Sequence, residues 1–149
     1  MLKRKLSAVV IWMLLGATVV GAAPAQATAP KTPDAAVRAV VQTYLHGLKF
    51  NDVASFKAAF WPDAKLYFVK RDSTLGQLSQ EEWYKGFAAT AGKEEAGELG
   101  ITSVDITGDA ASVKVLETYP ASIYVDYLNL LRLNGEWRIV NKIYTSRKR

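Results

Sequence analysis

Apolar side chains recur with helical spacing in the first part of the chain that follows Pro33. They stand three or four positions apart, at Val37, Val40, Val41, Tyr44, Leu45 and Leu48. This spacing predicts an amphipathic helix of about three turns, with Asp34 as its N-cap. A second, shorter helix is expected after Asn51-Asp52, because Asp is a favoured N-cap residue, and it should end at Pro62-Asp63.

Most of the remaining sequence alternates between apolar and polar residues, which predicts strands. The expected strands, in chain order, are 65–70, 101–107, 111–119, 123–133 and 136–145. A third helix, opened by a capping box of Ser79 and Glu82, should lie between the first two strands. Helices followed by an antiparallel sheet are typical of an α+β domain, and a curved sheet beside three helices can leave a cavity.

The last turn predicts which residues share a face of the sheet. Asn134-Gly135 is the strongest hairpin signal in the chain, and a two-residue turn there pairs Leu133 with Glu136. Strict alternation then places one set of residues on the more apolar face, towards the helices: Asp126, Leu128, Leu130, Arg132, Trp137, Ile139, Asn141 and Ile143. Lys142 and Tyr144 fall on the opposite, outer face.

The turns at Gly108-Asp109 and Pro120-Ala121 extend this counting to the two preceding strands. They place Glu117 on the inner face, close to Asp126, provided that no bulge occurs at Pro120. Glu117, Asp126 and Asn141 would then be polar groups on an otherwise apolar inner surface. Because unpaired burial of such groups is costly, they must meet partners, water or a ligand.

Two interpretations of this inner polar group stay open. It is either a satisfied structural network, or a polar cluster that contacts a ligand in an aromatic-lined pocket. The candidate ligand-binding residues are Tyr44, Trp61, Trp83, Glu117, Tyr124, Asp126 and Asn141. Glu117 and Asp126 are also the candidate catalytic residues, because two neighbouring carboxyl groups can have their pKa values driven apart.

The N-terminal residues have the pattern of a secretory signal peptide. Lys3, Arg4 and Lys5 precede an apolar run over 6–20, and small-x-small sites follow. The run is shorter than the roughly 20 residues that span a bilayer, so we expect cleavage and no membrane association afterwards. The expected organisation is a signal peptide at 1–27, a linker at 28–33, a domain at 34–146 and a basic tail at 147–149, in an exported protein that is periplasmic or secreted.

Composition narrows the possible chemistry. The chain has no cysteine and one histidine, which excludes disulfides, thiolate ligands and His-rich metal sites, so neither a metal nor a cofactor is expected. The net charge of +5 falls to +2 once Lys3, Arg4 and Lys5 leave with the signal peptide, since 16 basic residues then face 14 acidic ones. Without a basic stripe, nucleic-acid binding is not expected.

The order of the predicted elements resembles the nuclear transport factor 2-like superfamily. The opening motifs of that superfamily are matched by Val40-Val41-Gln42-Thr43-Tyr44-Leu45, Gly47, Asp52, Phe60 and Pro62-Asp63-Ala64. The closing segments 124–131 and 137–142, with Gly135 between them, resemble the putative lumazine-binding family within it. The resemblance covers 34–145 and implies a cone-shaped α+β barrel with a pocket, and dimerisation through the outer face of the sheet.

Ketosteroid isomerases, an enzyme branch of the same superfamily, provide a test of activity. They share the Val-Val-Gln-x-Tyr run, and the resemblance matches their oxyanion-donating tyrosine to Tyr44. Their general base, an aspartate, corresponds to Phe68 in this chain. Because a phenyl ring cannot accept a proton, the resemblance argues against the same isomerisation.

The sequence therefore predicts an exported, homodimeric, non-enzymatic domain that binds a small, partly apolar molecule. One alternative is a proton-transfer enzyme of the isomerase or cyclase kind, in which Glu117 and Asp126 would exchange the proton. Another is an interaction module that uses its outer sheet face to bind a further exported protein.

Overall fold

A computed structural model describes residues 32–149 of the chain. The expected signal peptide and most of the expected linker lie outside these residues. The helices are α1 (Pro33–Phe50), α2 (Val53–Ala59) and α3 (Gln80–Tyr84), and α3 continues into the 3-10 helix η1 (Lys85–Thr90). The strands are β1 (Phe60–Val69), β2 (Leu75–Ser79), β3 (Glu98–Thr107), β4 (Ala110–Thr118), β5 (Ser122–Leu133) and β6 (Glu136–Lys148). None of the helices in this described part is long and apolar enough to cross a membrane.

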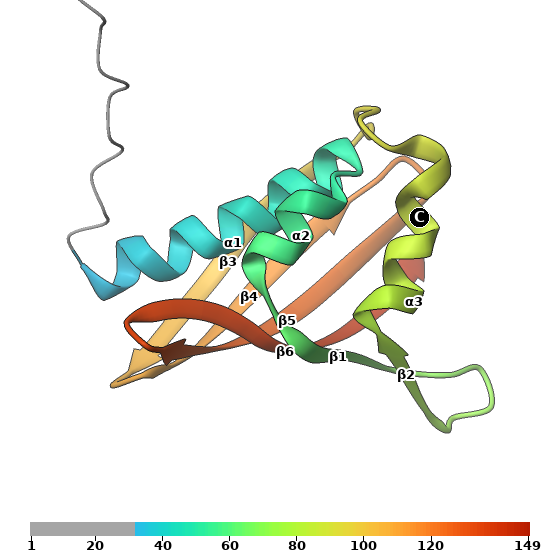
Figure 1. Cartoon of the computed structure of the whole chain (residues 1–149). Coiled ribbons are helices and arrows are strands. Elements are labelled where there is room, and N and C mark those ends of the chain that lie inside the picture. Colours follow the sequence, from blue (N-terminus) through green and yellow to red (C-terminus); the bar gives the residue numbers. More distant parts are fainter. Residues whose placement is uncertain (1–31) are drawn as a thin grey trace, which may run out of the picture.

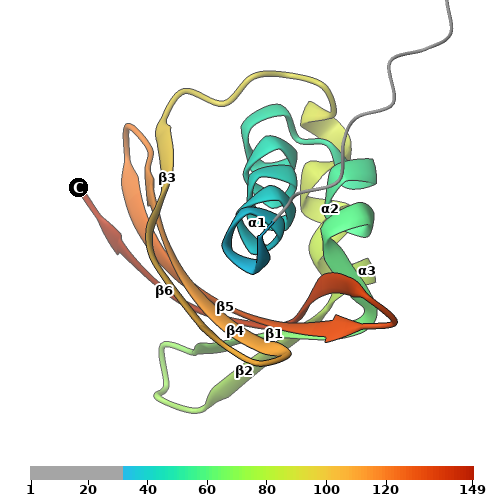
Figure 2. The ribbon, with the colours of Figure 1, turned by 90° about the vertical axis from the view of Figure 1, so that its left-hand side faces the viewer.

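The strands form one curved sheet, and the helices lie in its concave side (Figures 1 and 2). The strand order is β2-β1-β6-β5-β4-β3, and every pairing is antiparallel except β1 with β6, which is parallel. The expected α+β architecture of three helices on a curved sheet is confirmed. The sheet is open rather than a closed barrel, because β2 and β3 remain as edges.

Helix α1 begins earlier than its apolar spacing predicts. Its N-cap is Thr32, whose hydroxyl accepts a hydrogen bond from the Ala35 amide at 3.2 Å, and Pro33 occupies the first turn. Proline suits that position because its fixed φ is helical and its missing N–H would be unpaired there anyway. Asp34, the expected N-cap, instead pairs with Arg38 at 2.7 Å. The helix ends at Phe50, and its C-cap residue Asn51 adopts the left-handed conformation with φ of 52°.

The segment between α2 and α3 differs most from the prediction. Helix α2 is capped by Asp52 as expected, but it ends at Ala59, and β1 starts at once with Phe60. Pro62 therefore lies within a strand, where the pairing of β1 with β6 is irregular between Phe60 and Lys65. Strand β2 is too short to give a periodic signal and was not predicted. The capping box that opens α3 is confirmed.

The core lies between α1 and the concave face of the sheet. It includes Val37, Val41, Tyr44, Leu45 and Leu48 from α1, with Val113, Val115, Leu128, Leu130 and Ile139 from the sheet. Gly47 allows α2 to approach α1 closely, because a Cβ at this position would stand 2.5 Å from the Phe56 ring. The aromatic rings of Phe56, Trp83 and Phe87 then extend the core towards α3 and η1.

The hairpin registers explain both the successes and the errors of the face assignment. Strands β4 and β5 pair as counted, with Glu117 opposite Tyr124, and no bulge occurs at Pro120. Strands β5 and β6 also start as counted, with Leu133 opposite Glu136, but the register shifts by one residue between Asn129 and Leu130.

Beyond this shift the predicted faces of β6 are wrong. Lys142 is buried on the inner side, whereas Ile143 is 46% exposed and Asn141 pairs with Asn129 on the outer side. Residue Val140 is the extra residue that causes the change, and a one-residue offset turns each later side chain to the other face. Strand β6 also continues to Lys148, so most of the expected basic tail is paired with the start of β5.

Candidate functional site

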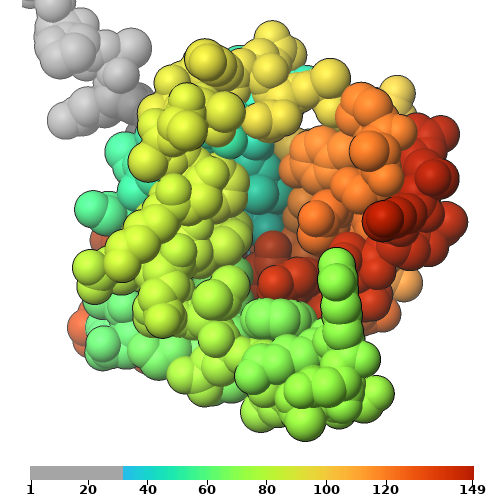
Figure 3. Space-filling model, turned by 90° about the vertical axis from the view of Figure 1, so that its right-hand side faces the viewer, coloured from blue at the N-terminus to red at the C-terminus, as the bar shows by residue number. Residues whose placement is uncertain are grey.

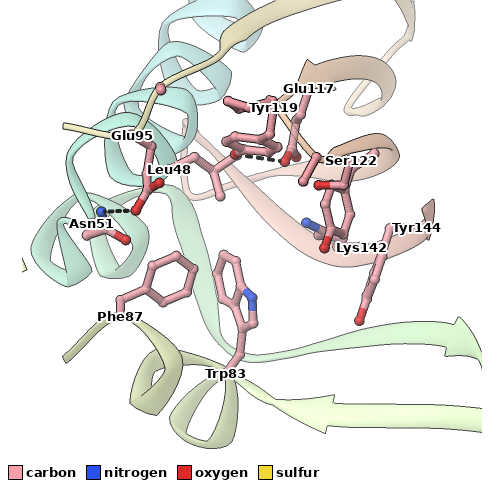
Figure 4. A pocket seen from close by; sticks show the side chains of 14 residues that line it. Leu48, Asn51, Trp83, Phe87, Glu95, Glu117, Tyr119, Ser122, Lys142 and Tyr144 are labelled. Carbon is pink, nitrogen blue, oxygen red and sulfur yellow. Dashed lines mark hydrogen bonds between the residues drawn. The ribbon is translucent and has the colours of Figure 1, made fainter. Parts of the chain in front are cut away.

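A cavity of about 560 Å³ opens at one end of the domain, between the α3–η1 segment and the ends of β4, β5 and β6. In the space-filling view it is the hollow between the yellow-green surface of α3 and η1 and the orange and red strands (Figure 3). Five aromatic side chains line it: Trp83, Phe87, Tyr119, Tyr124 and Tyr144. Glu117 and Lys142 are the ionisable groups at its inner end, and Glu95 lies on its outer side (Figure 4).

Four polar side chains from four elements meet behind the aromatic walls. The Lys142 ammonium lies 2.6 Å from Asp126 Oδ2 and donates a hydrogen bond to the Tyr44 hydroxyl at 2.7 Å. The Tyr44 hydroxyl in turn donates to Asp126 Oδ2 at 2.5 Å, and lies 3.3 Å from Glu117 Oε1. We call Tyr44, Glu117, Asp126 and Lys142 the inner cluster.

Local strand geometry explains how the sheet supplies three members of the inner cluster. Asp126 stands directly opposite Val115, so Glu117, two residues further along β4, points to the same face. On β6 the shift at Val140 turns Lys142 to that face as well. Tyr44 comes from the buried stripe of α1 and closes the cluster from the other side.

The protonation of Glu117 follows from its surroundings. Burial raises the pKa of the Glu117 carboxyl to about 8, and its hydrogen bond with Asp126 adds to the rise, while the Lys142 ammonium only partly opposes it. Glu117 is therefore a neutral acid at neutral pH. The Tyr119 hydroxyl donates to its second oxygen, Oε2, at 3.1 Å.

Asp126 has the opposite behaviour. Burial alone would raise the pKa of its carboxyl, but the Lys142 charge and hydrogen bonds from Glu117, Lys142 and Tyr44 outweigh burial and lower it. Asp126 Oδ1 accepts no hydrogen bond from an N–H or hydroxyl group of the described residues. The interaction between the two carboxyl groups raises the pKa of Glu117 and lowers that of Asp126, which favours a single negative charge on the pair.

The Lys142 ammonium is also surrounded by aromatic rings. Its Nζ lies 5.0 Å from the ring centre of Tyr144, 5.2 Å from that of Tyr44 and 5.3 Å from that of Trp83. Rings at this distance attract a cation through their negative faces. Within the inner cluster, the charge of the Lys142 ammonium is balanced by the Asp126 carboxylate, and Glu117 is a neutral acid.

Three of the four members of the inner cluster were predicted from the sequence as site residues. Tyr44, Glu117 and Asp126 lie where they were expected, and Trp83 and Tyr124 line the cavity. Tyr44 and Asp126 are completely buried and lie behind the lining residues, so they would act on a ligand through their neighbours. The role of all five residues in ligand binding stays a prediction.

Two expected site residues lie elsewhere. Asn141 faces the outer side, where its Oδ1 accepts a hydrogen bond from Asn129 at 2.8 Å. Trp61 is 40% exposed and is not part of the cavity wall, because it lies in the irregular segment of β1. Lys142 was missed, and the signal that could have found it is electrostatic, since a buried Asp126 requires a cation.

Within residues 32–149, no three His, Asp or Glu side chains are grouped closely enough to hold a metal ion. The inner cluster also contains an ammonium group, which would repel a cation.

The fold defines the class of protein as nuclear transport factor 2-like. An NTF2-like protein of unknown function from Silicibacter pomeroyi DSS-3 is 27% identical, with a TM-score of 0.67 over 76% of this chain and 95% of that one. A second, from Shewanella baltica OS155, is 26% identical, with a TM-score of 0.68 over 75% of this chain and 91% of that one.

More distant structures share the fold alone. One is a ketosteroid isomerase-like protein from Erwinia carotovora atroseptica, at 17% identity and a TM-score of 0.56, which covers 75% of this chain and 94% of that one. A comparison with curated proteins gives no match. Residues 32–145 match the family described as putative lumazine-binding, and the chain belongs to that family.

Proposed function

We propose that this protein binds a small, partly apolar organic molecule in the cavity between η1 and the ends of β4 to β6, and does so after export. The observation that carries the proposal is the cavity itself, with a volume of about 560 Å³, aromatic walls and a polar inner end. Small-molecule sites are typically hollows of this size, with apolar walls and a few convergent polar groups. The family's name points to the same kind of ligand.

Binding without reaction is the better-supported form of this function. Asp126 has no exposed surface, so it cannot reach a substrate directly. Both oxygens of Glu117 already face the hydroxyl groups of Tyr44 and Tyr119. Both carboxyl groups are therefore held by neighbouring side chains, which suits a preorganised binding surface more than a cycle of proton transfer.

Native mass spectrometry of the mature protein, purified untagged from the exporting compartment, tests this proposal. The expected result is a reproducible small adduct on a protein whose mass is that of the chain cleaved after Ala25 or Ala27, at one of the two small-x-small sites. The variant Ser122→Trp places a large ring in the cavity and should remove the adduct. The matched variant Ser103→Trp, at an exposed position on edge strand β3, should keep it. Retention of the adduct in Ser122→Trp would contradict binding in this cavity.

A proton-transfer enzyme remains the second candidate, because the pKa of Glu117 is raised to about 8 and this carboxyl lines the cavity. Such a group is poised to exchange protons near neutral pH. The test is deuterium exchange at the carbon next to the carbonyl of 4-chromanone, followed by NMR in D₂O. If the protein catalyses proton transfer, the exchange rate should rise through pH 8 and the acceleration should be lost in Glu117→Gln. An exchange rate equal to that without protein would exclude catalysis for this probe.

The outer face of the sheet supports a further proposal, that the protein forms a homodimer. This face exposes large apolar side chains at Leu116, Tyr127, Leu131 and Ile143, each 39–46% accessible. Such a patch is typical of an interface, either with a second copy or with another exported protein. Light scattering of the purified protein should give twice the monomer mass, and Ile143→Glu should reduce it to the monomer. A wild-type monomer would favour the interaction-module alternative.

A further inference from the structure

The hydrogen-bond donors of Lys142 indicate what the cavity selects. An ammonium group has three N–H donors. In the described part of the chain its hydrogen bonds are to Asp126 and Tyr44, and both partners are completely buried behind the cavity wall. Lys142 itself is a lining residue, and its nitrogen stands between Glu117 on one side and Trp83 and Tyr144 on the other (Figure 4). The third N–H is therefore left for a ligand.

The groups beside Lys142 do not change the kind of ligand atom that its third N–H requires. Both oxygens of Glu117 already face the hydroxyl groups of Tyr44 and Tyr119. The indole nitrogen of Trp83 is turned towards Lys142 and Tyr144, not towards Phe87 (Figure 4). A ligand atom placed beside Lys142 thus meets N–H donors, and it should itself be a hydrogen-bond acceptor.

The charges around the cavity set the charge of the ligand. The Lys142 ammonium is already balanced by Asp126 at 2.6 Å, so a buried anion would add an uncompensated negative charge. Glu95, on the outer side of the cavity, would also repel an anion. A cation would stand against the Lys142 ammonium at the inner end. An uncharged acceptor avoids both costs.

The walls set the shape of the ligand. Trp83 and Phe87 on one side and Tyr144 on the other present flat aromatic surfaces to the space between them (Figure 4), and Tyr124 also lines the cavity. We propose that the cavity selects an uncharged, flat ring system that carries a carbonyl-type oxygen, and that Lys142 determines this specificity by donating its third N–H to that oxygen. This inference rests on the proposed binding function and names the ligand's chemical class.

A matched series of bicyclic probes tests the inference on the wild-type protein. Titration calorimetry would compare 2-quinolone, which has a ring carbonyl, with naphthalene-2-carboxylate, 1-methylquinolinium and 1-methylnaphthalene, which replace it by an anion, a cation and a methyl group. We expect 2-quinolone to bind at least about tenfold more tightly than any of the other three, the ratio for one hydrogen bond to a charged donor. Equal affinities, or preference for the anion or the cation, would overturn the inference while leaving a binding cavity.

A variant then assigns the preference to Lys142. Lys142→Met alone would leave Asp126 unpaired, so the double variant Lys142→Met/Asp126→Asn is used, in which the second substitution replaces the carboxylate with a neutral amide of the same shape. Its affinity for 2-quinolone should fall to that for 1-methylnaphthalene, and the outer-face control Lys114→Met should keep the wild-type ratio. A retained preference in the double variant would show that Lys142 does not select the ligand.

Two outcomes separate this inference from the proposed function. If none of the four probes binds and the purified protein carries no adduct, then the proposed function fails and the inference fails with it. If the probes bind without preference for the carbonyl, then only the inference is wrong. Should the double variant not fold, the ratio of affinities in the wild-type protein decides.

Discussion

The two hairpins that share β5 differ in how their pairing follows the sequence. Strand β4 pairs with β5 without interruption from Ala110 opposite Leu131 to Thr118 opposite Ile123. The pairing of β5 with β6 shifts by one residue near Asn129, and every side chain beyond that point changes face. The inner cluster takes Glu117 from the regular hairpin and Lys142 from the shifted one.

The difference teaches how a single extra residue decides the electrostatics of a site. With strict alternation, Asn141 would face the interior and Lys142 would stand in solvent. Asp126 would then be a buried carboxylate without a cation, which is strongly unfavourable. The shift at Val140 exchanges these two neighbours and places an ammonium 2.6 Å from Asp126. Bulges are often found where a side chain must be redirected in this way.

The largest expected effect comes from removing the side chain that the shift turns inward. Lys142→Met should lower the free energy of unfolding by about 3–5 kcal/mol, because it leaves the Asp126 carboxylate buried without its partner. Urea denaturation at pH 7 measures this. The control is Lys114→Met on the regular hairpin, where the ammonium lies 5.6 Å from the Tyr127 ring at the surface, and it should cost less than about 1 kcal/mol. Equal costs would mean that Lys142 is not the buried partner.

Glu117, on the regular hairpin, should make the free energy of unfolding depend on pH. The pKa of Glu117 rises from 4.5 to about 8 on folding, so the folded state binds the extra proton. Binding of this proton stabilises the folded state, and the stabilisation is complete below pH 4.5 and is lost as the pH rises to about 8. Relative to Glu117→Gln, which keeps a neutral donor, the wild type should lose up to about 1.4 kcal/mol of stability per pH unit across this window.

Two comparisons isolate the effect of Glu117. Glu98→Gln, at an exposed carboxyl on β3, should leave the wild-type pH dependence unchanged. Asp126 acts at the acid end, because its pKa is lowered on folding and its stabilisation is lost as the pH falls below 3.8. Parallel stability curves for the wild type and Glu117→Gln between pH 5 and 8 would show that Glu117 is not a buried neutral acid.

A smaller effect is expected at Tyr44, which joins the two hairpins. Tyr44→Phe keeps the ring but removes the hydroxyl that donates to Asp126 at 2.5 Å and accepts from Lys142 at 2.7 Å. We expect a loss of about 1–3 kcal/mol in thermal or urea denaturation, since two charged groups each lose a buried partner. Tyr127→Phe on the outer face, where the side chain is 40% exposed, is the control. A cost no greater than that of the control would argue against the hydroxyl's bridging position.

The smallest effect is expected at Asn141, the residue that strict alternation would place inside. Asn141→Ala removes a hydrogen bond with Asn129 on the outer side, and it should cost less than about 1 kcal/mol. It should also leave any bound adduct in place. A loss of stability as large as that of Tyr44→Phe, or loss of the adduct, would mean that β6 keeps strict alternation after all.

The sequence by itself determined what depends on neighbours along the chain. The apolar stripe of α1, the capping box at Ser79 and the two-residue turns at Gly108-Asp109 and Asn134-Gly135 are all local signals, and each is confirmed. Alternation counted from Asn134-Gly135 and from the turn at Pro120-Ala121 correctly placed Glu117 and Asp126 on one face. The fold class and three of the four members of the inner cluster follow from these signals, because secondary structure and hairpin register are set within a few residues.

Only the tertiary structure decided the rest. Lys142 reaches the site through an interruption of the regular ladder at Val140. The interruption has a cost, but it lets Lys142 pair with Asp126, 16 positions earlier in the chain, and with Tyr44, 98 residues away. These two contacts outweigh the cost. The parallel pairing of β1 with β6 and the exposure of Trp61 likewise depend on strands that meet only after folding. The bulge at Val140 leaves no periodic pattern in the local sequence, so it could not be predicted. What stabilises it is an ion pair between residues on two different strands.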